Sequence, residues 1–178
     1  MTARRRGFER TIAALAAVLA AAVVLVAPVT VSGGSVAWGT SCADAAPAQA
    51  TVAVGLVVDF GVLKSAGDPG SLQVTCVPLA PGTNGLDLLE ATGHRYRLSG
   101  SGLLCAIDGR PVAPACGTPN GSGFDYWSYW IGGSSWTYAT VGPASRAMLD
   151  GTVEGWRFVT GGNNVAPSTS ASFAALTS

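Results

Sequence analysis

The stretch FDYWSYW at residues 124–130, followed by IGGSSWTY at residues 131–138, decides the fold of this chain. Six aromatic residues lie between positions 124 and 136, although aromatic residues make up only 8% of the whole sequence. Tyr and Trp favour β-strands, and Gly132-Gly133 supplies the positive φ angles that tight hairpin turns need. The sequence therefore predicts a β-hairpin with a dense set of aromatic rings.

The turn length sets which rings share a face of this hairpin. With a two-residue turn, four rings lie on one side: Trp127, Tyr129, Trp136 and Tyr138. These four form either the core or a working surface. The other side carries Tyr126 and Trp130, with Trp130 opposite Ser135. Because one helix covers only one face of a sheet, we expect Trp130 to be exposed, and exposed aromatic patches commonly mark interaction sites.

The first 37 residues predict a signal peptide for export. Four arginines precede an apolar stretch at residues 12–29, and Ser35-Val36-Ala37 offers the small residues that a signal peptidase reads. A second candidate cleavage site lies after Ala45. An uncleaved membrane anchor is the alternative, since the apolar stretch is just long enough to span a bilayer. Arg5-Arg6 fits either a twin-arginine signal or an ordinary basic leader. We expect a secreted, extracellular or cell-surface protein.

Net charge and cysteine content limit the possible partners. The chain has ten basic and ten acidic residues, of which residues 1–37 hold four Arg and one Glu, so six basic and nine acidic residues remain. With no basic patch, we do not expect nucleic acid as a partner. An even number of cysteines in an exported chain predicts disulfides rather than a metal site, and we expect no cofactor.

Two disulfides are predicted, Cys105–Cys116 and Cys42–Cys76. Cys105 ends an apolar strand, and the following ten residues, rich in Pro and Gly, can return the chain to it. Cys42 precedes the first strand, and Cys76 lies late in the strand expected beside it. Four cysteines permit three connectivities, so the other pairings stay open.

Hydrophobic patterning predicts one domain over residues 38–160. Alternating apolar residues indicate antiparallel strands at residues 51–61 and 71–78 and later strands at 103–107 and 153–159. Between them, Asn84 can cap a short helix that Gly93 can close. A short helix on a mixed sheet makes an α+β fold, and the order of elements is β-grasp-like. Residues 161–178, with little to bury, predict a disordered tail.

Five blocks of sequence together resemble a known family. They are VVDFG (57–61), CAIDGRP (105–111), YWSYW (126–130), WTY (136–138) and EGWRF (154–158). They resemble small exported bacterial proteins often associated with energy-coupling-factor (cobalt-type) transport systems, which are similar to the C-terminal β-domain of transcobalamin and intrinsic factor. The resemblance spans residues 42–160 and implies ligand or surface binding. Those carriers hold cobalamin against a second, large helical domain, for which this chain has no counterpart.

The expected function is therefore non-catalytic binding through aromatic side chains. The candidate ligand-binding residues are Tyr126, Trp127, Tyr129, Trp130, Trp136, Tyr138 and Trp156. The partner is an unknown small ligand, such as a corrinoid or metal complex delivered to a micronutrient transporter, or a protein or wall glycan at the cell surface. An enzyme reading would use Asp125 and Glu154 as paired carboxylates of a glycosidase.

Charged residues beside the aromatic blocks are expected to be exposed. Asp59 alternates with the apolar residues of its strand and so points away from the core. Glu154 and Arg157 flank Trp156 and predict an exposed ion pair.

Overall fold

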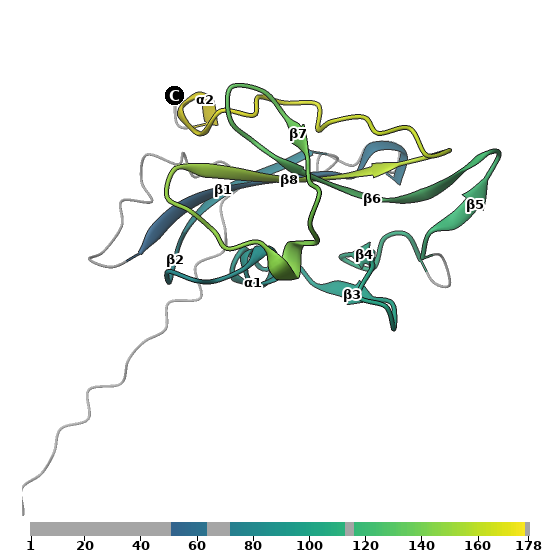
Figure 1. The fold of residues 1–178 in the computed structure, drawn as a ribbon, viewed down its shortest axis with the longest axis horizontal. Helices are drawn as coiled ribbons and strands as arrows, with labels where there is room; N and C mark the ends of the chain where they lie inside the picture. The colour runs from purple at the N-terminus through teal and green to yellow at the C-terminus, as the bar shows by residue number, and fades with distance from the viewer. Residues whose placement is uncertain (1–50, 64–71, 113–115, 177–178) are drawn as a thin grey trace, which may run out of the picture. The chain divides into compact units, whose positions relative to one another are not determined.

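The computed structural model describes residues 51–63, 72–112 and 116–176 of the chain, and within these ranges the fold is built on one six-stranded sheet (Figure 1). Its strands follow the order β2-β1-β8-β6-β5, with β7 also pairing with β6, while β3 and β4 form a separate two-stranded sheet. The strands are β1 (Val52–Asp59), β2 (Leu72–Leu79), β3 (Tyr96–Leu98), β4 (Leu104–Ile107), β5 (Thr118–Asn120), β6 (Gly123–Ile131), β7 (Thr137–Tyr138) and β8 (Thr152–Val159).

The main sheet is mixed, because its two central strands are parallel. β1 pairs with β8 in parallel, whereas β1 with β2 and β6 with β8, β5 and β7 are antiparallel. The predicted antiparallel pair at residues 51–61 and 71–78 is thus confirmed. A mainly β structure with a mixed sheet and few helices also confirms the α+β fold class.

The helix α1 (Gly85–Ala91) begins and ends where the sequence predicts. The Asn84 side chain accepts the N–H groups of Leu86 and Asp87, and the Asp87 carboxylate accepts the N–H of Asn84, which completes a capping box. Gly93 follows at φ +85°, where glycine is strongly favoured. The other helical turns are η2 (Gly61–Leu63), η3 (Pro143–Ser145) and α2 (Phe173–Leu176).

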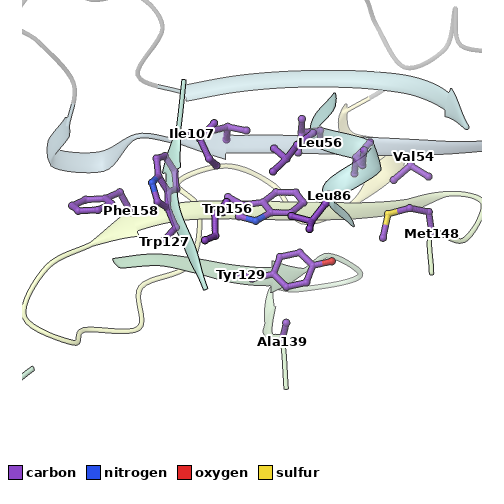
Figure 2. Packing of buried hydrophobic residues seen from close by; sticks show 14 of the residues in the cluster. Val54, Leu56, Leu86, Ile107, Trp127, Tyr129, Ala139, Met148, Trp156 and Phe158 are labelled. Carbon is purple, nitrogen blue, oxygen red and sulfur yellow. The ribbon is translucent and has the colours of Figure 1, made fainter. Parts of the chain in front are cut away.

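One face of the main sheet, called here the helix face, packs against α1 and the β3–β4 sheet. Trp156 is fully buried at its centre between Leu56 and Tyr129, and its ring stacks on Tyr129 with centroids 4.7 Å apart (Figure 2). Trp127 meets Phe60 and Phe158 edge to face. The other members of this apolar core are Val54, Val58, Leu79, Leu86, Leu88, Leu89, Leu104, Ile107, Ala139 and Met148.

The opposite face, called here the strap face, is covered by residues 161–176, the C-terminal segment (Figure 1). Phe173 and Leu176 of α2 lie over Gly55 of β1, and Pro167 packs beside Gly155 of β8. This differs from the expected disordered tail. The segment has few apolar side chains, as the sequence indicates, but the polar side chains of the sheet bind its backbone.

The aromatic hairpin has a longer turn than the sequence suggested. Trp130 pairs with Tyr138 and Ile131 with Thr137, so five residues, 132–136, form the loop. The loop is three residues longer than a two-residue turn. Because this difference is odd, the side chains of the returning strand point to the opposite faces from those predicted. The predicted arrangement of four rings on one side is therefore wrong.

Both faces of β6 are buried at residues 127–130. Trp127 and Tyr129 lie on the helix face, whereas Trp130 lies on the strap face, with its ring edge to face against Tyr138 at 5.3 Å. Trp130 is 7% exposed and Trp127 is 3% exposed, so the expected exposure of Trp130 is wrong. The C-terminal segment provides the second covering layer that the sequence analysis lacked.

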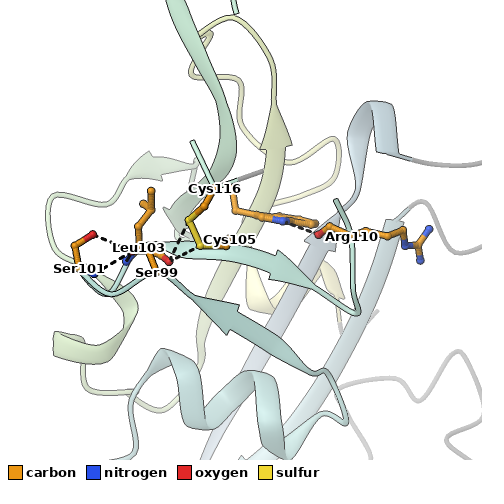
Figure 3. Close-up of a disulfide and its surroundings, with 7 residues drawn as sticks. Ser99, Ser101, Leu103, Cys105, Arg110 and Cys116 are labelled. Carbon is orange, nitrogen blue, oxygen red and sulfur yellow. Dashed lines mark hydrogen bonds between the residues drawn. A yellow bond between two sulfur atoms is a disulfide. The ribbon is translucent and has the colours of Figure 1, made fainter. Parts of the chain in front are cut away.

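One predicted disulfide joins Cys105 of β4 to Cys116, with Cα atoms 4.4 Å apart, beside the backbone of Leu103 (Figure 3). Cys76 is also disulfide-bonded. Its predicted partner Cys42 lies outside the described residues, as does the predicted signal peptide at residues 1–37. In the part of the chain that the structure describes, no helix is long and apolar enough to cross a membrane.

Candidate ligand-binding groove

Five of the seven candidate aromatic residues line a single groove at the edge of the main sheet. They are Tyr126, Trp127, Tyr129, Tyr138 and Trp156. The groove has a volume of about 290 Å³. The other two candidates lie elsewhere: Trp130 is buried on the strap face, and the Trp136 ring packs against Gly155 while its indole N–H donates to the carbonyl of Thr169.

Two loop segments form the remaining walls of the groove. Residues 102–104 come from the turn before β4 and the first residue of that strand, and residues 139–143 lead from β7 into η3. At its mouth the groove has exposed apolar side chains, because Tyr138 is 40%, Leu103 43% and Val141 48% exposed. None of the residues in these two segments is among the predicted site residues: Leu103 and Leu104 belong to a predicted apolar strand, residues 139–143 belong to no strand or helix pattern, and the two segments meet only in the folded chain.

The groove occupies a break in the pairing of β6. On the edge of β6 that faces away from β8, β5 pairs only as far as Asp125 and β7 begins at Trp130. Within the described ranges, residues 126–128 therefore have no strand partner on that edge. An unpaired strand edge leaves room for a bound group beside the backbone.

A buried polar cluster supports the floor of the groove. The Tyr129 hydroxyl donates to Glu154 Oε2 at 2.5 Å, and Arg146 Nε donates to Glu154 Oε1 at 2.9 Å. Burial raises the pKa of Glu154, although the bonds from Tyr129 and Arg146 act in the opposite direction. Burial, with the nearby Glu154 carboxylate, also raises the pKa of Tyr129, so its hydroxyl remains a donor. The cluster fixes the Tyr129 ring.

The expected exposed ion pair of Glu154 with Arg157 is wrong, because successive residues of β8 point to opposite faces. Glu154 is fully buried on the helix face. Arg157 lies on the strap face and pairs with Asp59 at 3.2 Å. Asp59 is itself buried, since Ser168 of the C-terminal segment donates both its N–H and its hydroxyl to the Asp59 carboxylate.

A second cavity, of about 510 Å³, lies where the parallel strands β1 and β8 end. Its charged groups already bind one another: Arg157 pairs with Asp59 and donates to the carbonyl of Ala166 at 2.8 Å. The arrangement holds the C-terminal segment in place.

Other polar residues have structural partners. The ring of His94 lies 2.8 Å from Asp108, whose other oxygen accepts the N–H of Arg95. Asp125 accepts from the Asn120 side chain and from Gly161 N–H, and neither Asp125 nor Glu154 lines the groove. Among the described residues, no group of three or more His, Cys, Asp or Glu side chains could hold a metal ion.

Comparison with known proteins extends the domain beyond the predicted boundary at residue 160. No curated protein matches the chain. The family described as the SCO2322-like domain matches residues 28–121 and 119–178, a range that includes both walls of the groove and the C-terminal segment. These two matched stretches cover most of the sequence, and the chain therefore belongs to the SCO2322-like domain family.

Proposed function

We propose that this protein is an exported, non-catalytic binding domain that takes a small, largely apolar ligand group into the aromatic groove. The observation that carries the proposal is the convergence of Tyr126, Trp127, Tyr129, Tyr138 and Trp156 on one groove. Ligand sites are typically concave and lined mainly by apolar and aromatic side chains. The disulfide Cys105–Cys116 is consistent with an oxidising, extracellular location.

The proposed role is that of an accessory to a micronutrient transporter, with a corrinoid or metal complex as cargo. It rests on the resemblance to transport-associated proteins and to the β-domain of transcobalamin, and on a β-grasp-like reading of the sheet and α1. The groove, at about 290 Å³, is at the lower end of ligand pockets. It would hold one edge of such a cargo and leave the rest for the transporter to contact.

Isothermal titration of the full chain with cyanocobalamin and cobinamide tests this role. Tyr138→Ala removes an exposed wall of the groove, and Phe124→Ala is the matched control, since Phe124 is 53% exposed but does not line the groove. We expect Tyr138→Ala to weaken binding at least about tenfold. If the wild type binds neither compound, corrinoid cargo is excluded. If the two variants bind with equal affinity, the groove is excluded as the binding site.

A cell-surface interaction module, binding a protein partner or a wall glycan, is the second candidate. It is favoured by the exposed apolar side chains Leu103, Val141 and Tyr138 around the mouth of the groove, because such patches mark interaction surfaces. Genes for a transporter's membrane and ATPase subunits beside this one favour the first role. Titration of wall glycan fragments against the same two variants tests the second.

A further inference from the structure

The indole N–H of Trp156 is the feature of the groove that the proposed function leaves unexplained. Trp156 lines the groove, is fully buried, and its Nε1 has no hydrogen-bond partner among the described residues. A buried donor without an acceptor is unfavourable, and most buried N–H groups are paired. Trp156 therefore belongs both to the buried core and to the wall of the groove.

Three other donors of the groove already have acceptors. The Trp127 indole donates to the carbonyl of Arg110 at 3.1 Å, and the Tyr129 hydroxyl donates to Glu154 at 2.5 Å. The Tyr126 hydroxyl donates to the side chain of Asn164. Trp156 thus differs from these neighbours in offering a donor that the protein itself does not use.

The volume and charge of the groove limit what can reach this donor. A cavity of about 150 Å³ holds benzene, so about 290 Å³ accommodates one ring or two fused rings. Among the residues that the structure describes, no charged side chain lines the groove, and a charged ligand would lose hydration there without a partner. Aromatic walls favour a planar group, which can pack against ring faces or edges.

We propose that the groove binds a neutral, planar heteroaromatic group of one or two fused rings, whose edge carries a hydrogen-bond acceptor for the Trp156 N–H. This inference rests on the proposed function and defines the ligand class of the same groove. The ring fills the space beside Tyr129 and Tyr138, and the acceptor satisfies the unpaired indole. A hydrocarbon of the same shape fills the groove but leaves the donor unpaired.

Isoquinoline and naphthalene test the acceptor, because they share size and shape and only isoquinoline has an acceptor nitrogen. Each is titrated into the ¹⁵N-labelled full chain at mildly alkaline pH, where isoquinoline is neutral. The chain has five Trp, so the indole N–H signals are few, and Trp156→Phe assigns the relevant one. We expect isoquinoline to bind roughly three- to tenfold more tightly than naphthalene and to move the Trp156 N–H signal downfield.

Trp156→Phe should abolish the preference for isoquinoline, whereas Phe124→Ala should retain it. If Trp156→Phe fails to fold, the wild-type signal decides alone. If the two probes bind equally and the Trp156 signal does not move downfield, the proposed hydrogen bond from Trp156 to the ligand is wrong, although the groove still binds rings. Binding of neither probe overturns both this inference and the groove itself.

Discussion

The helix face and the strap face of the main sheet are buried by different means. On the helix face, apolar side chains from α1 and the β3–β4 sheet meet those of the main sheet, as expected of a packed core. On the strap face, an irregular segment lies over the sheet, and its backbone is held by side chains such as Asp59, Trp136 and Arg157. A segment poor in apolar residues can therefore cover aromatic rings when the sheet supplies its hydrogen bonds.

This difference explains the position of the groove. The hairpin has rings on both faces, and Trp127 and Tyr129 on the helix face are buried, as is Trp130 on the strap face. The open site lies at the edge of β6, where strand pairing is interrupted between β5 and β7. Aromatic residues serve as core on the faces and as groove lining at the edge.

The largest expected effect tests whether the strap face is as much a core as the helix face. Trp130→Ala and Trp127→Ala should each lower the free energy of unfolding by about 3–5 kcal/mol, because both rings are buried. Urea unfolding of the two variants measures this. Phe124→Ala, at an exposed side chain, should change it by less than about 0.5 kcal/mol. A small loss in Trp130→Ala alone would show that the C-terminal segment covers the strap face only loosely.

Local features of the fold could be predicted from the sequence, because nearby residues determine them. Asn84, Asp87 and Gly93 bound α1 through their own hydrogen bonds and backbone angles. Cys105 and Cys116 are close in sequence, so their pairing followed from the intervening loop.

Long-range features could not be predicted from one sequence. The parallel pairing of β1 with β8 joins residues about a hundred positions apart, and no local pattern encodes it. Asp59 is bound by Ser168, and Glu154 is bound by Arg146. Both of these partners lie in loops, which have no strand or helix pattern of their own. The aromatic content did indicate the five aromatic residues of the groove, but the five-residue turn exchanged the expected faces of the hairpin.

A smaller effect is expected from the polar attachment of the C-terminal segment. Asp59→Asn should lower the free energy of unfolding by about 2–3 kcal/mol, because Arg157 and both donors of Ser168 lose a charged acceptor. Ser168→Ala, which removes only the hydroxyl bond, should cost about 1 kcal/mol. Denaturant unfolding gives both values, and limited proteolysis should release the segment sooner in Asp59→Asn. Equal stability of Asp59→Asn and wild type would rule out this attachment.

Close backbone packing against the same segment gives a third test. A Cβ at Gly132 would meet the carbonyl oxygen of Ala171 and the Val153 side chain, so Gly132→Ala should cost about 1–3 kcal/mol. Gly100→Ala is the matched control, because nothing lies near its Cβ position and its φ is not in the left-handed region. Thermal unfolding of the pair is sufficient. If the two variants melt together, residue 171 does not sit against the loop as described.

The smallest expected effect is a pH dependence that belongs to the helix face. Burial raises the pKa of Glu154 above 4.5 in the folded state, so the folded protein binds a proton there more readily than the unfolded chain does. Stability contributed by this residue is therefore greatest at pH values below its unfolded pKa and falls as the pH rises through the folded pKa. Glu154→Gln replaces the carboxyl group with an amide of similar size that does not ionise.

The measurement is the difference in unfolding free energy between wild type and Glu154→Gln, followed by urea denaturation from acidic to neutral pH. The wild type should lose stability relative to Glu154→Gln as the pH rises, and the difference should then level off once Glu154 is ionised in both states. Other carboxyl groups titrate in both proteins and cancel in the difference. A difference that instead grows in favour of the wild type would mean that Arg146 and Tyr129 stabilise the carboxylate more than burial penalises it. In that case the cluster beneath the groove would be an ion pair that favours ionisation of Glu154.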